Sequence, residues 1–162
     1  NGQFATIYLA PNNYPRIHMP LDARLLSAKF IPGRLFSVQP STARAIDGLF
    51  ARNERLAMHF ESAAGPFVLV LVGALFVGSM ETVMEGKICP PHSRHIRAFD
   101  YSKAQHELQR GEELARFNMG STVVLLLPEG MANWRKDLGP GDPVQMGQAL
   151  GELCEACMCH VA

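Results

Sequence analysis

The most apolar stretch of the chain, residues 66–80, reads Pro66-Phe-Val-Leu-Val-Leu-Val-Gly-Ala-Leu-Phe-Val-Gly-Ser-Met80, and the charged Glu81 follows it at once. Its valine content is typical of buried strands. A membrane-spanning helix needs about 20 apolar residues, whereas this run is shorter and contains two glycines. The run therefore favours a pair of core strands, at 67–72 and 74–79, over a buried helix or a membrane span.

Outward from this run, short apolar segments alternate with turns that are rich in glycine, proline and asparagine. These segments predict strands at 4–10, within 16–26, at 55–60, 81–88 and 122–127, and a last strand or hairpin arm at 144–150. Residues 40–44 predict a short helix with Ser41 as its N-cap, Pro32-Gly33 a turn, and 91–103 a polar surface connection. The fold class expected is mainly β (α+β), a single domain of short, mostly antiparallel strands with minor helix.

Composition limits the partners and the cellular setting. The chain has 162 residues, and fifteen basic side chains balance fifteen acidic ones, so the net charge gives no indication of nucleic-acid binding. Three of the four cysteines lie in the last ten residues, which is unlike a secreted disulfide framework and fits a reducing cytosolic setting. The chain opens on Asn1-Gly2-Gln3 and runs directly into a strand without a signal peptide, which suggests that upstream sequence is missing.

Two groups of side chains have ligand-binding chemistry. The tail at 153–162 holds four potential zinc ligands within seven residues: Cys154, Cys157, Cys159 and His160. Such close ligands would be strained in one tetrahedron, so exposed thiols are the preferred interpretation and no metal site is predicted. His92 and His95 lie in a polar stretch with arginines, which indicates a solvated loop, with a phosphate headgroup contact as the alternative.

Gly120-Ser121 stands at a tight turn just before the apolar strand at 122–127. Glycine has no Cβ to shield its carbonyl and adopts strained backbone at low cost. A serine hydroxyl that follows such a carbonyl can attack it and convert the amide into an ester, provided that a base activates the hydroxyl. Elimination from the ester would release the preceding segment and leave a pyruvoyl group. On these residues alone, a plain turn is the more ordinary interpretation.

His18 is the candidate base. It lies between two prolines in the stiff segment Tyr14-Pro15-Arg16-Ile17-His18-Met19-Pro20. The alternative is a partly buried histidine whose ring is satisfied by a backbone carbonyl. On this residue alone, the alternative is preferred.

Read together, five segments of the chain resemble the phosphatidylserine decarboxylase family. They are YLAPNNYPRIHMP (8–20), PGRLFSV (32–38), LFARNER (49–55), the stretch from VGA to GSMETV (72–83) and RFNMGSTV (116–123). The last is similar to the family's cleavage motif, which is Leu-Gly-Ser-Thr in its common form. The segments come in family order and cover roughly residues 3–152.

The resemblance implies a set of roles. Ser121 would become the pyruvoyl group, and hence the cofactor, at the start of the smaller chain; Gly120 would end the larger chain, and His18 would be the base for self-cleavage. The pyruvoyl carbonyl would form a Schiff base with the amine of phosphatidylserine and accept electrons as carbon dioxide leaves, before phosphatidylethanolamine is released. The partners expected are phosphatidylserine, the cytoplasmic side of the cell membrane as a peripheral surface, and the second cleavage chain in a heterodimer, with further dimerisation left open.

The chain departs from the family pattern in three respects. Pro15 stands where the family usually has a histidine that is associated with decarboxylation. Met119 replaces the usual leucine with a side chain of similar volume. The aspartate that completes the family's serine–histidine–aspartate arrangement is expected upstream of these residues; Asp22, four residues after His18, is a poor substitute because Pro20 intervenes.

These inferences divide the chain into an N-terminally truncated catalytic core at 1–152 and a cysteine-rich tail at 153–162. The leading interpretation is a self-processing lipid decarboxylase. One alternative is a family member that is unprocessed or impaired in turnover because of Pro15. Another is a non-catalytic β binding module, although a carrier domain would present a lysine at a hairpin tip, and the sequence has no such tip.

Overall fold

The computed structural model describes residues 2–12, 14–75, 80–88, 94–104, 106–118 and 120–154. Its helices are α1 (Pro40–Ala45) and α2 (Leu49–Arg52). Its strands are β1 (Gly2–Leu9), β2 (Arg16–His18), β3 (Ala23–Ile31), β4 (Arg55–Ser62), β5 (Gly65–Val72), β6 (Met80–Thr82), β7 (Gly86–Lys87), β8 (Arg97–Asp100), β9 (Glu107–Leu108), β10 (Glu113–Phe117), β11 (Ser121–Pro128), β12 (Ala132–Trp134) and β13 (Gly151–Leu153). The expected fold class, mainly antiparallel β with minor helix in one domain, is confirmed.

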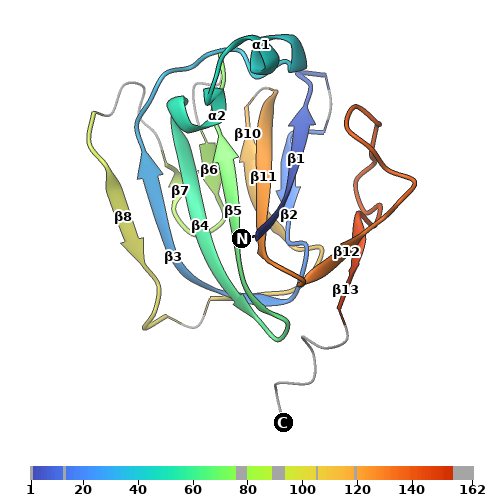
Figure 1. Cartoon of the computed structure of the whole chain (residues 1–162). Coiled ribbons are helices and arrows are strands. Elements are labelled where there is room, and N and C mark those ends of the chain that lie inside the picture. The colour runs from blue at the N-terminus through green and yellow to red at the C-terminus, as the bar shows by residue number, and fades with distance from the viewer. Residues whose placement is uncertain are drawn as a thin grey trace.

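The strands form two main sheets. Among the described residues, seven strands make one sheet, in the order β1-β11-β5-β4-β3-β8 with β9 beside β3, and four make a second, in the order β2-β10-β6-β7. The second sheet lies behind the first, and both helices lie at one end of the molecule (Figure 1). The buried side chains of the two sheets belong to a shared hydrophobic core.

The centre of the large sheet comes from the most apolar segments of the sequence. β11 lies between β1 and β5. Its odd-numbered residues from 121 to 127 are all buried, whereas Leu126 and Pro128 on its other face are exposed. Burying a valine or leucine side chain contributes about 1.5–3 kcal/mol. A slip of one residue would exchange the two faces, so this alternation fixes the register of β11.

The apolar run that starts at Pro66 is confirmed as a core strand in its first half. β5 ends at Val72, Ala74 and Leu75 are not in a strand, and the rest of the predicted strand at 74–79 lies outside the described residues. Within the described part of the chain, no helix is long and apolar enough to cross a membrane.

Two expected features are wrong. Residues 144–150 form no strand, because the Gln145 N–H donates to the side-chain oxygen of Gln148 and Gly147 adopts a φ of +82°, which folds the segment into a turn. The last strand is instead β13. Residues 97–100, inside the expected surface connection, form β8 and pair with β3. Charged side chains are common on edge strands. Because β8 carries them, the search for apolar segments did not predict it as a strand.

Three local details also differ from expectation. Gln39, not Ser41, is the N-cap of α1, and no side chain makes a capping bond there; Pro40, whose fixed φ suits a first turn, starts the helix. The predicted strand at 81–88 is a hairpin of β6 and β7 around a turn at 83–85. Helix α2 was not expected from the sequence.

Candidate active site

Ser121 opens β11 and is completely buried, with 0% of its surface exposed. Its register partner on β1 is Leu9, and the next residue of β11 pairs with Val72 at the end of β5. The Ser121 hydroxyl donates a hydrogen bond of 2.9 Å to the carbonyl oxygen of Val72. The predicted nucleophile is therefore held in a position without water, and its proton points to a carbonyl, which is not a base.

Gly120 precedes this serine at a place where only glycine fits. A Cβ on residue 120 would lie 2.5 Å from the backbone nitrogen of Pro11 and 2.7 Å from the carbonyl oxygen of Leu9. Both atoms belong to the backbone at the end of β1 and just after it, so neither can give way as the tip of a flexible side chain would. The segment after β1 thus passes directly beside the Gly120-Ser121 bond and requires a residue without a side chain there.

Asn53 fixes the strand end that accepts the Ser121 hydroxyl. Its side chain is completely buried and makes three hydrogen bonds: the amide donates to the carbonyl oxygens of Phe36, at 2.9 Å, and Gly73, at 2.8 Å, and its oxygen accepts the Phe36 N–H at 3.0 Å. Gly73 follows Val72 directly. Through one side chain, the loop at 36, the start of β4 and the end of β5 are joined beside Ser121.

A second set of close contacts supports the same region. Pro32-Gly33 makes no turn, contrary to expectation; instead the backbone runs so close to Arg52 and Glu54 that a Cβ on Gly33 would lie 2.5 Å from the Arg52 carbonyl oxygen and 2.6 Å from the Glu54 nitrogen. Arg34 bonds through its backbone to both residues, at 2.8 Å each. Glu54 in turn accepts the Gly73 N–H at 2.9 Å, and its buried side chain lies against Gly73.

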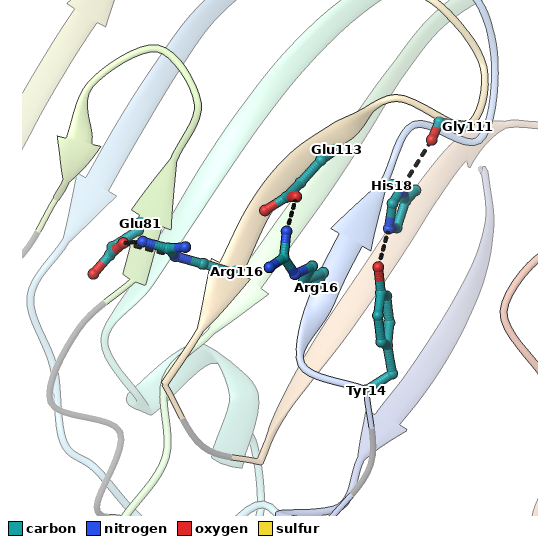
Figure 2. Close-up of polar contacts among 7 residues, drawn as sticks. All are labelled: Tyr14, Arg16, His18, Glu81, Gly111, Glu113 and Arg116. Atoms are coloured by element: carbon teal, nitrogen blue, oxygen red, sulfur yellow. Dashed lines mark hydrogen bonds and ion pairs between the residues drawn. The ribbon is translucent and has the colours of Figure 1, made fainter.

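His18 has both of its ring nitrogens in hydrogen bonds (Figure 2). The carbonyl oxygen of Gly111, 2.7 Å from Nδ1, can only accept, so Nδ1 carries the hydrogen and Nε2, 2.9 Å from the Tyr14 hydroxyl, accepts from it. The Tyr14 and His18 rings are also stacked, with centroids 5.7 Å apart. The sequence-based alternative, a histidine satisfied by a backbone carbonyl, describes these contacts.

A family model described as phosphatidylserine decarboxylase matches residues 1–152. The chain belongs to the phosphatidylserine decarboxylase family. A curated relative from Nitrosococcus oceani, named phosphatidylserine decarboxylase proenzyme, is 51% identical over 99% of this chain and 53% of its own length. Relatives of the same name from Polaromonas sp. (strain JS666) and Polaromonas naphthalenivorans are 52% and 53% identical over 93% and 94% of this chain and 54% of each relative. The chain thus spans about half the length of the curated relatives it matches.

The segments that resemble phosphatidylserine decarboxylases in sequence meet around Ser121 in space. The loop at 32–38, the segment at 49–55 and the turn after Val72 are joined by Asn53 and by the close approach at Gly33. The segment after β1 lies against Gly120. The structure therefore accounts physically for several of these blocks, because each supports the backbone on which the predicted nucleophile rests.

Position 15, where the decarboxylase family usually has a histidine, lies beside the strand that leads toward Gly120 and Ser121. The Phe117 N–H donates a hydrogen bond of 3.0 Å to the Pro15 carbonyl oxygen, and Phe117 ends β10. His18 pairs instead with Glu113, at the opposite end of this strand, roughly 13 Å away at the usual rise per residue. The described contacts do not bring His18 to Ser121, and its role as the base stays a prediction.

The second sheet carries two ion pairs, and the Asp22 carboxylate bonds to the backbone near His18. Arg16 pairs with Glu113 across β2 and β10, and Arg116 with Glu81 across β10 and β6 (Figure 2). Exposed pairs of this kind contribute little to stability, about 0–1 kcal/mol. Asp22 accepts the Arg110 N–H at 2.6 Å rather than contacting His18. A backbone carbonyl, that of Gly111, orients the imidazole here.

No metal centre is found in the part of the chain that the structure describes, where no three His, Cys, Asp or Glu side chains gather closely enough to hold an ion. Cys154 is a free, partly exposed thiol. The other potential ligands of the tail, like His92 and the leucine replacement Met119, lie outside the described residues. His95 is exposed.

Sequence reasoning missed the Val72 carbonyl, which accepts the Ser121 hydroxyl, and Asn53, which fixes the backbone next to it. The Val72 carbonyl is 49 positions away in sequence, and a backbone oxygen carries no side-chain signal. Asn53 lies in the segment at 49–55 that resembles the family. Nothing in the sequence distinguishes a buried asparagine that bridges two loops from an exposed one.

Proposed function

We propose that the protein containing this chain converts phosphatidylserine into phosphatidylethanolamine, with a pyruvoyl group that it makes from Ser121 by cutting itself after Gly120. The observation that carries the proposal is the arrangement at the cut: a fully buried serine hydroxyl directly follows a glycine that no other residue could replace. The word proenzyme in the names of the relatives supports a processing step.

Self-cleavage would begin with the Ser121 hydroxyl. Its oxygen bonds to the carbonyl carbon of Gly120 while the bond from that carbon to the Ser121 nitrogen breaks; a base takes the hydroxyl proton and the nitrogen receives one, so an amide becomes an ester of the same composition. Loss of the Ser121 α-proton then expels Gly120 as a carboxylate. The dehydroalanine that remains takes up water and releases ammonia, which leaves the pyruvoyl group at position 121.

The pyruvoyl group would supply the electron sink for loss of carbon dioxide. The chain's own residues would position it and keep water away: β1 and β5 flank residue 121, and Asn53 fixes the end of β5. Electrostatic interactions are stronger in such a site than in water. Cutting after Gly120 frees the end of the larger chain, and we infer that this release opens the buried position to the substrate amine.

His18 remains our proposed base for self-cleavage. To act on Ser121 its ring would have to leave Tyr14 and Gly111, and the serine hydroxyl would have to leave Val72.

We also propose that the protein works as a peripheral protein on the cytoplasmic side of the cell membrane, because its substrate is a membrane lipid. In its mature form it would be a heterodimer of the two cleavage chains.

Intact mass measurement of the natural protein tests the proposal. We expect two fragments, the smaller starting at position 121 with a blocked terminus, and a single uncut chain for Ser121→Ala. Hydroxylamine, which attacks esters, should accelerate cutting and leave a hydroxamate on Gly120. A Ser121→Ala protein that still splits after Gly120 would falsify the assignment.

A His18→Gln variant, whose amide can keep both hydrogen bonds but takes no proton near neutral pH, should cut far more slowly if His18 is the base.

A second candidate is a family member that processes itself but turns over poorly, and Pro15 favours it. The position lies beside the end of β10 that leads to Ser121, and a proline there has no group that can exchange a proton. Release of carbon dioxide from phosphatidylserine by the matured protein separates the two candidates.

A further inference from the structure

Thr122 carries a hydroxyl for which the described part of the folded chain provides no partner. The residue is completely buried, and within the described residues its Oγ1 has no hydrogen bond. Buried polar side chains are nearly always bonded, and neighbouring ones obey this rule: Ser121 bonds to Val72, and Asn53 makes three bonds. A valine of the same shape would avoid the free-energy cost of the lone hydroxyl. The hydroxyl therefore calls for an explanation other than stability.

The position of this hydroxyl relative to the cut bond is fixed by the sheet. Thr122 pairs with Tyr8 on one side and with Val72 on the other. Because side chains alternate along a strand, its side chain lies on the face opposite to that of Ser121. Thr122 also remains attached to the residue that is cut free, so it is present before, during and after cleavage.

The chemistry of cleavage creates a need for a hydrogen-bond donor on that face. When the Ser121 oxygen attacks the Gly120 carbonyl carbon from its own face of the strand, the carbon becomes tetrahedral. The carbonyl oxygen is then displaced toward the opposite face and becomes negatively charged. A donor that is already in place and shielded from water stabilises such an oxyanion without reorganising. Hydrogen bonds to charged oxygen are also stronger than those to neutral oxygen.

We propose that the Thr122 hydroxyl is the donor that stabilises the negative charge on the Gly120 oxygen during self-cleavage. The inference deepens the proposed function and rests on it. The backbone of Thr122 would stay paired with Tyr8 and Val72 while its side chain turns toward the oxygen. No oxidant, metal or further reactant is involved, because the donor keeps its proton.

Four forms of the natural protein test this proposal by their rate of cutting and their melting temperature. Thr122→Val should cut about 10²–10³-fold more slowly than the wild type, as is typical when one oxyanion donor is removed, and should melt at the same or a higher temperature. Thr122→Ser keeps the hydroxyl and should cut within tenfold of the wild type. Thr82→Val is the matched control: Thr82 is also buried, but its hydroxyl accepts the Glu85 N–H at 3.1 Å, so this variant should melt lower and cut normally.

The outcomes separate the inference from the function on which it rests. If the wild type cuts, Ser121→Ala does not, and Thr122→Val cuts at the wild-type rate, the Thr122 role is wrong and the proposed function stands. A wild type that never cuts overturns both. Hydroxylamine should leave Thr122→Val slow, because it acts only after the ester has formed. Full rescue by hydroxylamine would place the hydroxyl in the later elimination step and would also overturn the proposal.

Discussion

At the scale of single residues, the buried side chain of Asn53 holds two backbone segments together. Its three hydrogen bonds all go to backbone atoms, those of Phe36 and Gly73. A polar group buried without its partner costs about 1–3 kcal/mol. The loop at 36 and the end of β5 therefore depend on this amide for their relative position.

We expect Asn53→Ala to lower the free energy of unfolding by on the order of 3 kcal/mol, because it leaves backbone groups buried without partners. Asn53→Asp should be no better, since it turns a carboxylate toward the two carbonyl oxygens that the amide satisfied. Denaturant unfolding measures both. Asn133→Ala, at an exposed position of β12, is the control and should stay within about 0.5 kcal/mol of the wild type. Equal midpoints for the Asn53 variants and the control would contradict the bridging role of Asn53.

Pro15 leads to a prediction about turnover. The proline carbonyl bonds to Phe117, and its side chain is exposed, so a histidine fits without loss of a backbone bond. If the family histidine exchanges a proton with the substrate, Pro15→His should raise decarboxylation of phosphatidylserine about 10²–10⁴-fold. The extent of self-cleavage should not change, because cleavage needs Ser121 rather than position 15.

Release of labelled carbon dioxide by matured protein measures this effect, with Pro140→His in an exposed turn as the control for an added histidine. A wild-type protein that already matches Pro15→His would show that the proton comes from elsewhere.

At the scale of elements, one tyrosine links the two sheets. Tyr101 directly follows β8 of the large sheet, and its hydroxyl donates a bond of 2.9 Å to Glu85 in the turn between β6 and β7. The Tyr101 ring also meets His106 edge-on, with centroids 5.2 Å apart. Burial and the neighbouring Glu85 carboxylate raise the pKa of the Tyr101 hydroxyl.

This pKa shift predicts the alkaline behaviour of the fold. An unfolded tyrosine ionises near pH 10, at a pKa of about 10, whereas the folded chain keeps Tyr101 protonated. The bond to Glu85 is therefore fully present below pH 10, and above it the unfolded state gains stability by ionising. Tyr101→Phe should be less stable by about 1 kcal/mol near neutral pH, and the gap to the wild type should narrow as pH rises above 10. Unfolding midpoints across this range check the trend, and a gap that widens would show that the sign is wrong.

The elements that could be predicted are those whose own side chains determine their secondary structure. β5 and β11 follow from dense valine and leucine. β8, by contrast, has the charged residues Arg97 and Asp100 at its ends. It is a strand because it pairs with β3. Residues 144–150 alternate like a strand, but the Gln145–Gln148 contact and the positive φ of Gly147 fold them into a turn. In the site, Val72 and Asn53 act through contacts between distant segments, so no local pattern could reveal them.

At the scale of the molecule, β11 occupies a central place in the sheet although it lies after the proposed cut. Every residue of β1 from Gly2 to Leu9 has a partner on β11, and β5 pairs along its other side. Both of these neighbours would belong to the larger fragment. The smaller fragment would thus contribute an inner strand of a sheet whose other members it does not contain.

We therefore expect the two fragments to stay together after self-cleavage. They should elute as one species from a sizing column in native buffer and separate only in denaturant. Electrophoresis of the eluted peak under denaturing conditions identifies both pieces. A smaller fragment that elutes alone would contradict the pairing of β11 described here.

The place of the proposed cut determines whether the sheet can form when the backbone is interrupted there. Residue 120 stands before the first paired position of β11, so severing the chain there removes no rung of the ladders on either side. Permuted and split proteins succeed when their new ends fall where connectivity is dispensable to the architecture. Two separately translated polypeptides, 1–120 and 121–162, would then reassemble into the same sheet, but the second would begin with an ordinary amine. Such a reassembled protein would have the fold of the mature form and lack its pyruvoyl group. It would serve as an inactive control for measuring lipid binding without decarboxylation.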